Sequence, residues 1–386
     1  MDRVLYSESD SRLRAQVAEF TRREIAPVAV AFDARAEVPE AVYRAFFDLG
    51  LLHGYIPEAY GGRSHTAVTT TVVAEELAFG CLAMAAALMV AILPISIVLR
   101  GGCECQRETW LRPLTRTFSL PAIACTEADA GSDLRSTATR AVRVGKEFHI
   151  SGQKTYVSNL PYAGFVVVIA RTESGERTGS GRSLSAFVVP RDAPGMEIGP
   201  RWNTAGLRSM AVCSLTLKDV VVPETSLLGE EGDGLSLLNA GLDISRIMMA
   251  SYAVGAARRV IGELLELGRS RGPGGERLSH KQDFRFRLVD MEEQVATARL
   301  LAWLAATSHD AGLKSTREAS LAKLHSGRMC SRIGSEALAL TEGLPFAERA
   351  TIEKFYREAP AIRIIEGSEP IQREIIFAEM LRRGLY

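Results

Sequence analysis

The spacing of apolar residues changes character twice along the chain. From about residue 8 to 116 apolar residues recur every three or four positions, with breaks at proline and glycine, as in SDSRLRAQVAEFTRREIAPVAVAF and PEAVYRAFFDLGLL. From about 120 to 226 the period falls towards two, and after Gly232 the helical spacing returns. The pattern predicts helices, then a β region, then long helices, which is an α+β fold that is mostly α.

Within the β region, TRAVRVGKEFHISG predicts two short strands around Gly145 and Lys146. The segments FVVVIA, SAFVVP and SLTLKDVVVP continue the series between turn-rich connections. The connection 172–183 is polar and rich in glycine, which predicts an exposed loop. We expect these strands to form an antiparallel sheet.

The C-terminal part carries one apolar seam with helical spacing, at Leu288, Met291, Val295, Ala298 and Ala302. Another long helix is expected to begin near Asp243. Small residues in the seam would let a neighbouring helix approach closely. We therefore predict a bundle of long helices and three domains, with boundaries at 1–118 (helical), 119–228 (β) and 229–386 (bundle).

Composition excludes several classes of protein. The chain has 386 residues, of which 47% are hydrophobic and 24% charged, so it can bury a large core. A disordered chain, a collagen-like repeat and a small disulfide scaffold are excluded. The formal net charge is zero, which offers no broad field for nucleic acid or an anionic membrane. We expect no nucleic-acid partner.

Six cysteines are scattered along the chain, and only Cys103 and Cys105 lie close together. Their one-residue gap is not the spacing of metal ligands or of a thioredoxin motif, so we expect reduced thiols, no metal site and a cytoplasmic protein. The first residues show no secretory signal. An uncharged stretch from Ala78 to Leu99 is long enough to span a bilayer, but it contains Gly80 and Pro94 and has no flanking basic cluster. We expect a buried helix there.

Polar residues and glycines concentrate in four segments, two of which belong to the β region. In Ala124–Asp133, Thr126, Gly131 and Ser132 could offer hydroxyl and backbone N–H groups to a flat heterocycle or a phosphate. In Ser151–Asn159, Tyr156 could stack on a ring system while Ser158 donates to it. Each has an ordinary alternative, since the first could be a plain loop and Tyr156 a core residue.

The other two segments lie in the C-terminal part. Arg271 stands in a glycine-rich connection and could reach a phosphate, although it could equally be solvated. In Ile365–Gln372, Ser368 fits a helix N-cap and Pro370 its first turn. Glu366 follows Ile364 and Ile365, and such apolar neighbours would raise a carboxyl pKa towards the range of a general base. A favourable interaction with the helix dipole is the alternative for Glu366.

Together and in this order, these segments resemble the acyl-CoA dehydrogenase family of flavoproteins. Matching motifs extend over more than 300 residues. The matches are Pro57–Gly62 with PE-x-YGG, Thr126–Asp133 with TEP-x-AGSD, Ser151–Asn159 with NG-x-K-x-WITN, Val221–Gly229 with VP…LG, Arg271–Gln282 with R-x-x-FG…Q, Arg357–Glu358 with RD and Glu366–Arg373 with EGT-x-x-IQR. Seven matches in register are far more specific than any one alone.

The resemblance implies an N-terminal helical domain, a middle antiparallel β domain and a C-terminal four-helix bundle, with FAD between the β domain and the bundle. It implies a homotetramer, or a dimer, in which the segment of Arg271 reaches the FAD of a neighbouring subunit. The implied catalytic base is Glu366. The implied cofactor-binding residues are Ala124, Thr126, Gly131, Ser132, Tyr156, Val157, Ser158, Arg271, Gln282, Ser368 and Gln372. The implied substrate-binding residues are Ser132, Asp243, Arg246 and Gly367.

The activity implied is α,β-dehydrogenation of an acyl thioester, with the β-hydrogen passing to FAD and electrons then to an electron-transfer flavoprotein or another acceptor. Three alternatives stay open at this point. The acyl group could be carried by an acyl-carrier protein instead of CoA, the oxidant could be dioxygen in an oxidase or monooxygenase, or the fold could serve only as a scaffold. Retention of Glu366 in its motif argues against a scaffold.

The chain departs from the family pattern at several positions. Tyr156 stands where the family has a tryptophan, and Gly274 where it has a phenylalanine. Glu342 precedes Gly343 in place of a glycine pair, and Ala339 replaces a glutamine. These changes cluster around the expected contact with the FAD of a partner subunit, so cofactor affinity or subunit arrangement is expected to differ, while Glu366 is untouched.

Overall fold

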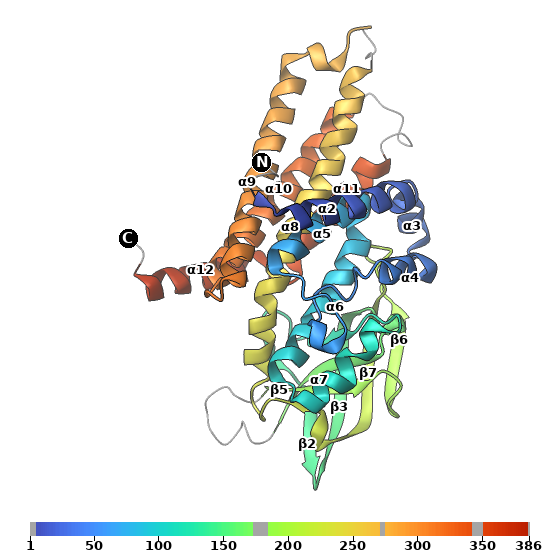
Figure 1. The fold of residues 1–386 in the computed structure, drawn as a ribbon, viewed down its shortest axis with the longest axis vertical. Helices are drawn as coiled ribbons and strands as arrows, with labels where there is room; N and C mark the ends of the chain where they lie inside the picture. Colours follow the sequence, from blue (N-terminus) through green and yellow to red (C-terminus); the bar gives the residue numbers. More distant parts are fainter. Residues whose placement is uncertain (1–4, 173–183, 271–274, 342–349, 385–386) are drawn as a thin grey trace.

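Two long helical hairpins rise from a β-sheet at the lower end of the molecule, and the N-terminal helices pack against their side (Figure 1). This computed structural model describes residues 5–172, 184–270, 275–341 and 350–384. The predicted loop 173–183 and the positions Arg271, Gly274, Glu342 and Gly343 lie outside the described residues. The expected α+β fold, with a helical part, a sheet and a bundle, is confirmed.

The N-terminal part is helical, as the spacing predicts. Its helices are α2 (Glu8–Phe20), α3 (Ala29–Arg35), α4 (Glu40–Asp48), α5 (Ala67–Gly80), α6 (Leu82–Gly101) and α7 (Glu104–Leu111). Among the described residues, the single-turn helices are η1 (Thr21–Ile25), η2 (Glu58–Tyr60), η3 (Pro113–Thr115), η4 (Leu134–Ser136), η5 (Leu160–Tyr162), η7 (Glu224–Ser226) and η8 (Leu278–His280). At the start of α2, Ser7 and Asp10 form a reciprocal capping box, which fixes where that helix begins.

The uncharged stretch 78–99 is not one helix. Helix α5 ends at Gly80, Cys81 is extended with φ −155°, and α6 begins at Leu82. Gly80 lies so close to η1 that an added Cβ would come within 2.4 Å of the Thr21 side chain. Among the described residues α6 alone is long and apolar enough to cross a membrane, and 94% of its most apolar window is buried inside the protein. The expected burial is confirmed.

The sheet has eight strands in the order β6-β7-β3-β2-β4-β5-β8, with β1 beside β4. Their bounds are β1 (Ala122–Ala124), β2 (Arg140–Val144), β3 (Glu147–Ser158), β4 (Phe165–Arg171), β5 (Leu184–Pro190), β6 (Met196–Arg201), β7 (Val212–Pro223) and β8 (Leu227–Leu228). Strand β4 is parallel to β1, and to β2 through one residue pair, so the expectation of a purely antiparallel sheet is wrong there. The long β2–β3 hairpin lies between β1 and β4 in sequence. After this hairpin the chain enters β4 in the direction in which it ran through β1.

Strand β4 is buried on both faces, which explains its unbroken apolar run. Phe165, Val167 and Ile169 pack with residues of α6 and α7. Val166 and Val168 point to the other side, into a cluster formed by the sheet residues themselves. The helices α6 and α7 therefore cover one face of the sheet, and a strand enclosed in this way needs no polar positions.

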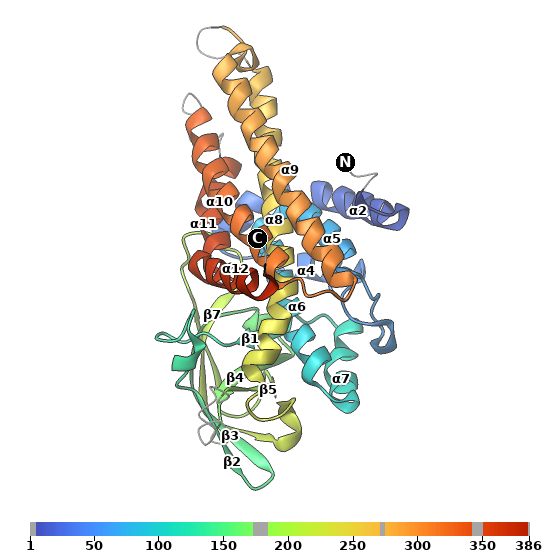
Figure 2. The same ribbon diagram turned by 90° about the vertical axis from the view of Figure 1, so that its left-hand side faces the viewer.

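The C-terminal part consists of α8 (Gly234–Arg269), α9 (Gln282–Asp310), α10 (Thr316–Leu340), α11 (Ala350–Ile364) and α12 (Glu369–Arg383). Helices α8 to α11 form the expected four-helix bundle, and α12 lies across its lower end, above the sheet (Figure 2). The seam predicted on α9 is buried. Helix α8 starts at Gly234 instead of near Asp243, because the apolar face already begins at Leu238.

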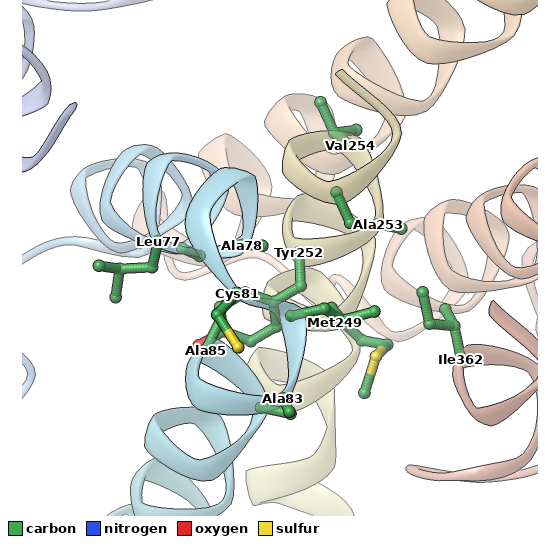
Figure 3. Close-up of a cluster of buried hydrophobic side chains, with 14 of the residues drawn as sticks. Leu77, Ala78, Cys81, Ala83, Ala85, Met249, Tyr252, Ala253, Val254 and Ile362 are labelled. Atoms are coloured by element: carbon green, nitrogen blue, oxygen red, sulfur yellow. The ribbon is translucent and has the colours of Figure 1, made fainter. Parts of the chain in front are cut away.

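One hydrophobic core joins the N-terminal helices to the bundle. Cys81, Ala83 and Ala85 face Met249 and Tyr252 of α8, and Ile362 of α11 lies on the other side of α8 (Figure 3). Small residues allow this contact to be close, since a Cβ at Gly255 would lie 2.0 Å from the Glu75 carbonyl oxygen. The bundle and the N-terminal helices thus hold α11 and the segment that follows it in a fixed position.

Candidate active site

The segment between α11 and α12 is a turn with unusual backbone geometry. Glu366 has φ 57° and Gly367 has φ 89°, so two consecutive residues are left-handed. A glutamate with positive φ is uncommon and persists only where surrounding contacts enforce it. The Gln372 Nε2 atom donates to the carbonyl oxygens of Glu366 at 3.2 Å and Gly367 at 2.9 Å. Lys323 Nζ also donates to the Gly367 oxygen.

Glu366 carries a carboxylate with an unsatisfied buried atom. Its Oε2 is buried and has no hydrogen-bond partner among the described residues. Burial raises the pKa of Glu366, and the nearby charges of Arg246 and Lys323 oppose that rise. The direction agrees with the expectation, although of the two preceding isoleucines Ile364 is 65% exposed and only Ile365 packs against the hydrophobic core.

Of the two cations, Arg246 of α8 has the larger effect on the pKa of Glu366. It is buried, and its Nη1 donates to Asp243 Oδ1 at 2.9 Å. Asp243 in turn accepts from Thr316 Oγ1 at 2.6 Å, while the Arg246 Nε atom has no partner among the described residues. The two expected substrate-binding residues on α8 are therefore paired with each other, one turn apart.

A cavity of about 860 Å³ opens beside this pair. It lies between α8, the α9–α10 connection and α12, and Asp243 and Arg246 form part of its wall. The polar and basic residues Arg100, Lys314 and Asn239 also line it, together with apolar residues such as Leu313 and Ile375. A volume of this size suits an extended small ligand.

The segment Ala124–Asp133 reaches the turn from the sheet. The Ser132 and Ser368 hydroxyl oxygens lie 3.3 Å apart, so the first and fourth polar segments meet directly. Ser368 occupies the N-cap position of α12, but its side chain makes no capping hydrogen bond. The charge of Glu366 acts on the pKa of the buried Cys125 thiol, which places the end of β1 near the carboxylate as well. Ala124 itself is buried in the sheet core.

Tyr156 is a surface residue and not a core tyrosine. Its side chain is 57% exposed, its φ is 55°, and its ring lies 5.2 Å from that of Trp202 with an interplanar angle of 38°. The register of β3 against β7 shifts between Lys154 and Val157, so a bulge turns Tyr156 out of the ladder. Val157 and Ser158 are buried. Only their backbone groups and the Ser158 hydroxyl remain available to a ligand.

Gln282 lies far from the turn within one chain. It begins α9 at the upper end of the bundle, opposite the sheet (Figures 1 and 2). From Arg246 to the end of α8 at Arg269 the helix rises roughly 35 Å at about 1.5 Å per residue. Gln282 is exposed there, so it can serve this site only from another subunit.

Sequence reasoning missed Lys323 and Cys125 near the turn, and Trp202 beside Tyr156. Lys323 is 1% exposed and sits on a helix face with the buried Ala319, Ala322 and Ser326. A lysine at a core position of a helix was the available signal, since a lysine is almost never fully buried unless its ammonium has partners. Neither Cys125 nor Trp202 carried a comparable signal.

Comparison with known proteins covers the whole chain. Models of the acyl-CoA dehydrogenase N-terminal, middle and C-terminal domains match residues 7–117, 122–220 and 232–381. A probable acyl-CoA dehydrogenase of Bacillus subtilis, YngJ, is 32% identical over 97% of this chain and 99% of its own.

Solved structures give the same result. Butyryl-CoA dehydrogenase from Megasphaera elsdenii superposes with a TM-score of 0.93 at 26% identity, covering 98% of this chain and 99% of its own. The prolyl acyl carrier protein oxidase AnaB superposes with a TM-score of 0.91 at 25% identity, covering 97% and 99%.

Proposed function

Since the chain belongs to the acyl-CoA dehydrogenase family, we propose that it removes hydrogens from Cα and Cβ of an acyl thioester, with Glu366 as the base. The family consists of FAD-binding flavoproteins, and FAD is the cofactor. The observation that carries the proposal is the unpartnered Glu366 Oε2, a desolvated carboxylate oxygen in the turn of the family's EGT motif.

The residues around the turn fit FAD. The buried Gln372 Oε1 has no partner among the described residues, as is the case for Glu366 Oε2. The Tyr156 ring is exposed, and a Cβ at Gly131 would meet nothing within 4 Å, which leaves the backbone of that loop open. When bound, FAD supplies the acceptor for the β-hydrogen. We assign its contacts to Ala124, Thr126, Gly131, Ser132, Tyr156, Val157, Ser158, Ser368 and Gln372, and to Arg271 and Gln282 of a neighbouring subunit.

Proton abstraction falls to Glu366. Its Oε2 takes the proton from Cα, and the carboxylate is a stronger base because burial raises its pKa. The backbone N–H of Glu366 is assigned to the thioester carbonyl oxygen, where negative charge develops as the proton leaves. Arg246 and Lys323 keep positive charge near the carboxylate, which opposes the rise in its pKa and so favours its ionised form.

The cavity beside Arg246 is assigned to the arm that carries the thioester. Its walls provide Asp243, Arg246 and Lys314 to polar groups of the arm. Ser132 and Gly367 do not line the cavity; we assign them to the thioester end of the substrate, because Gly367 follows the base and Ser132 contacts Ser368. Asp243 is already paired with Arg246, so its main contribution is to orient the guanidinium. A phosphate of the carrier would be attracted by Arg100 and Lys314.

The test is reduction of the flavin by substrate. The purified protein is expected to be yellow, and a suitable acyl thioester should bleach its absorption anaerobically. Glu366→Gln should abolish bleaching by the thioester, while FAD content and reduction by dithionite stay at the wild-type level. Unchanged bleaching in Glu366→Gln would refute the assignment of the base.

Two finer points need their own experiments. The similarity to a prolyl acyl carrier protein oxidase favours an acyl-carrier protein as the alternative to CoA, and dioxygen as the alternative to an electron-transfer flavoprotein. Titration with acyl-CoA and with acyl-carrier protein separates the carriers, since only the true one bleaches the flavin. Hydrogen peroxide released without another acceptor would identify an oxidase.

A homotetramer is part of the proposal, because Gln282 lies at the far end of the bundle and needs a partner's site. Light scattering on the holoenzyme gives the mass, and a monomer that retains FAD would contradict the assignment of Gln282.

A further inference from the structure

Lys323 has an unusual set of partners for a buried lysine. Its side chain comes from α10, and its Nζ donates to the Arg363 carbonyl oxygen at 3.3 Å and to that of Gly367. These two oxygens lie on either side of Glu366 in sequence. The Arg363 oxygen belongs to the last turn of α11, where carbonyl groups have no partner within the helix. One ammonium thus ties the end of α11 to the turn.

The turn needs such a tie. Glu366 and Gly367 both have a left-handed backbone conformation, which glycine adopts readily and glutamate ordinarily avoids. Gln372 holds the same turn from α12 through the oxygens of Glu366 and Gly367. The Gly367 oxygen therefore accepts from both Lys323 and Gln372, and both donors are buried.

Lys323 also belongs to the charge balance of the base. Burial lowers its pKa to about 8, Glu366 and Glu369 raise it, and Arg246 lowers it further. The groups that face it are the Glu366 carboxylate in the turn, Arg246 of α8 with its partner Asp243, the end of α11 at Arg363, and Glu369 of α12. The charges of Lys323 and Glu366 therefore affect each other's pKa, and the conformation of the turn determines how far apart they lie.

We propose that Lys323 is a positioning residue for proton abstraction, which holds the Glu366–Gly367 turn through the two carbonyl oxygens and keeps a positive charge beside the base. The proposal rests on the proposed function of Glu366. When Glu366 accepts the α-proton, its negative charge disappears, and the cations Lys323 and Arg246 then favour release of that proton. The ammonium therefore helps to reset the base as well as to place it.

A consequence concerns the acid limit of the reaction. Below about pH 8 Lys323 carries its proton, and this charge lowers the pKa of Glu366. Without the charge Glu366 should stay protonated to higher pH, so the fall in the rate of substrate-driven flavin reduction on the acid side should occur at higher pH.

Amide hydrogen exchange tests whether Lys323 holds the turn, and it does not require catalytic activity. Amide hydrogen exchange of segment 364–372 is compared between the wild-type holoenzyme, Lys323→Met, Lys323→Arg and Gln372→Leu. Loss of a charged donor should speed exchange there by about tenfold to a hundredfold in Lys323→Met, and Lys323→Arg should restore most of the protection. Lys218→Met, which removes an exposed lysine of β7, is the control and should leave this segment unchanged. Equal exchange in Lys323→Met and wild type would overturn the proposal.

The rate of flavin reduction by the thioester tests the role of the Lys323 charge. Lys323→Met should keep its FAD and its substrate dissociation constant, but reduce the flavin about a hundredfold more slowly, since small displacements of a reacting group have effects of that size. The acid-side fall of its pH profile should also lie at higher pH than in the wild type. Gln372→Leu should slow reduction but keep the wild-type position of that fall, because the ammonium is intact. An unchanged position in Lys323→Met contradicts the role of the Lys323 charge.

The two proposals fail in different ways. If no thioester bleaches the wild-type flavin, the proposed function fails, while the exchange experiment still decides whether Lys323 holds the turn. If Lys323→Met does not fold, Lys323→Arg keeps the donors and a charge that does not titrate below pH 12. That variant should then keep both the wild-type acid limit and the slow exchange of segment 364–372, and loss of either would overturn the proposal.

Discussion

Lys154 Nζ lies 2.7 Å from Glu127 Oε1. This buried ion pair connects the segments Ala124–Asp133 and Ser151–Asn159, which the sequence presents as two separate motifs. Glu127 also accepts from the backbone N–H groups of Ala138 and Thr139, and Lys154 donates to the Cys125 oxygen at 3.1 Å. The pair thereby fixes the end of β1 and the loop that brings Ser132 to Ser368. Both charged residues act on the site through structure and not by contact with a substrate.

Removing one partner of this pair should destabilise the fold. Glu127→Gln leaves the Lys154 ammonium buried without its counter-charge, so we expect a loss of about 3–5 kcal/mol in the free energy of unfolding. The double variant Glu127→Gln with Lys154→Met should recover part of it, because neither charge then remains unpaired. Urea unfolding of the wild type, Glu127→Gln, Lys154→Met and the double variant checks both expectations. Additive losses of stability in the double variant would contradict the pairing.

The same pair predicts a dependence of stability on acid. Burial raises the pKa of Glu127, but hydrogen bonds from Lys154, Thr139 and Ala138 outweigh it, so the net pKa is lowered. A carboxyl whose pKa is lower in the folded state stabilises the fold above its unfolded pKa, and this contribution is lost as pH falls through the folded value. The stability difference between wild type and Glu127→Gln should therefore shrink from pH 6 towards about pH 3. A constant difference would show that the charge of Glu127 is irrelevant.

Arg246 should set the acid limit of flavin reduction. Only ionised Glu366 can accept a proton, so the rate should fall as pH decreases through its raised pKa. Arg246→Gln removes a charge that lowers this pKa, and the fall should then occur at higher pH. Arg246→Lys, which keeps the charge, should move it less. The pH profile of thioester-driven reduction provides the measurement, and identical profiles for both variants would argue against the electrostatic role.

Two glycines of α8 offer a matched pair of stability variants. A Cβ at Gly255 would lie 2.0 Å from the Glu75 oxygen, whereas at Gly262, two turns later on the same helix, it would meet nothing within 4 Å. Gly262→Ala should stabilise the protein by about 0.5–1 kcal/mol through helix propensity. Gly255→Ala should destabilise it by about 1–3 kcal/mol, because α5 and α8 must move apart. Thermal unfolding of both variants checks the sign of each change.

Much of the fold could be predicted because its patterns are local. The seam on α9 and the apolar run of β4 are buried as their spacing indicates. Errors arose where a neighbour in space decided the outcome. The break at Cys81 reflects the approach of η1 to Gly80, and the parallel pairing of β1 with β4 depends on where the β2–β3 hairpin returns the chain.

The candidate site divides in the same way. The motifs around Glu127, Tyr156 and Glu366 carried the resemblance to the family, and the contact of Ser132 with Ser368 agrees with it. The sequence left Tyr156 open between a core residue and a residue that stacks on a ring system, and only the bulge in β3 turns it outward. Lys323 had no motif at all, since its partners are backbone oxygens whose identity the sequence does not encode.

The order of helices and strands, the family and the identity of the catalytic candidate were thus determined by the amino-acid sequence, because periodicity and short motifs depend on residues that are neighbours in the chain. The tertiary structure alone decided the electrostatics of that candidate. Of the two isoleucines before Glu366, Ile364 is largely exposed, yet the Glu366 carboxylate is desolvated and lies near two cations from other helices. Desolvation and charge depend on which segments pack together, and no local pattern specifies that.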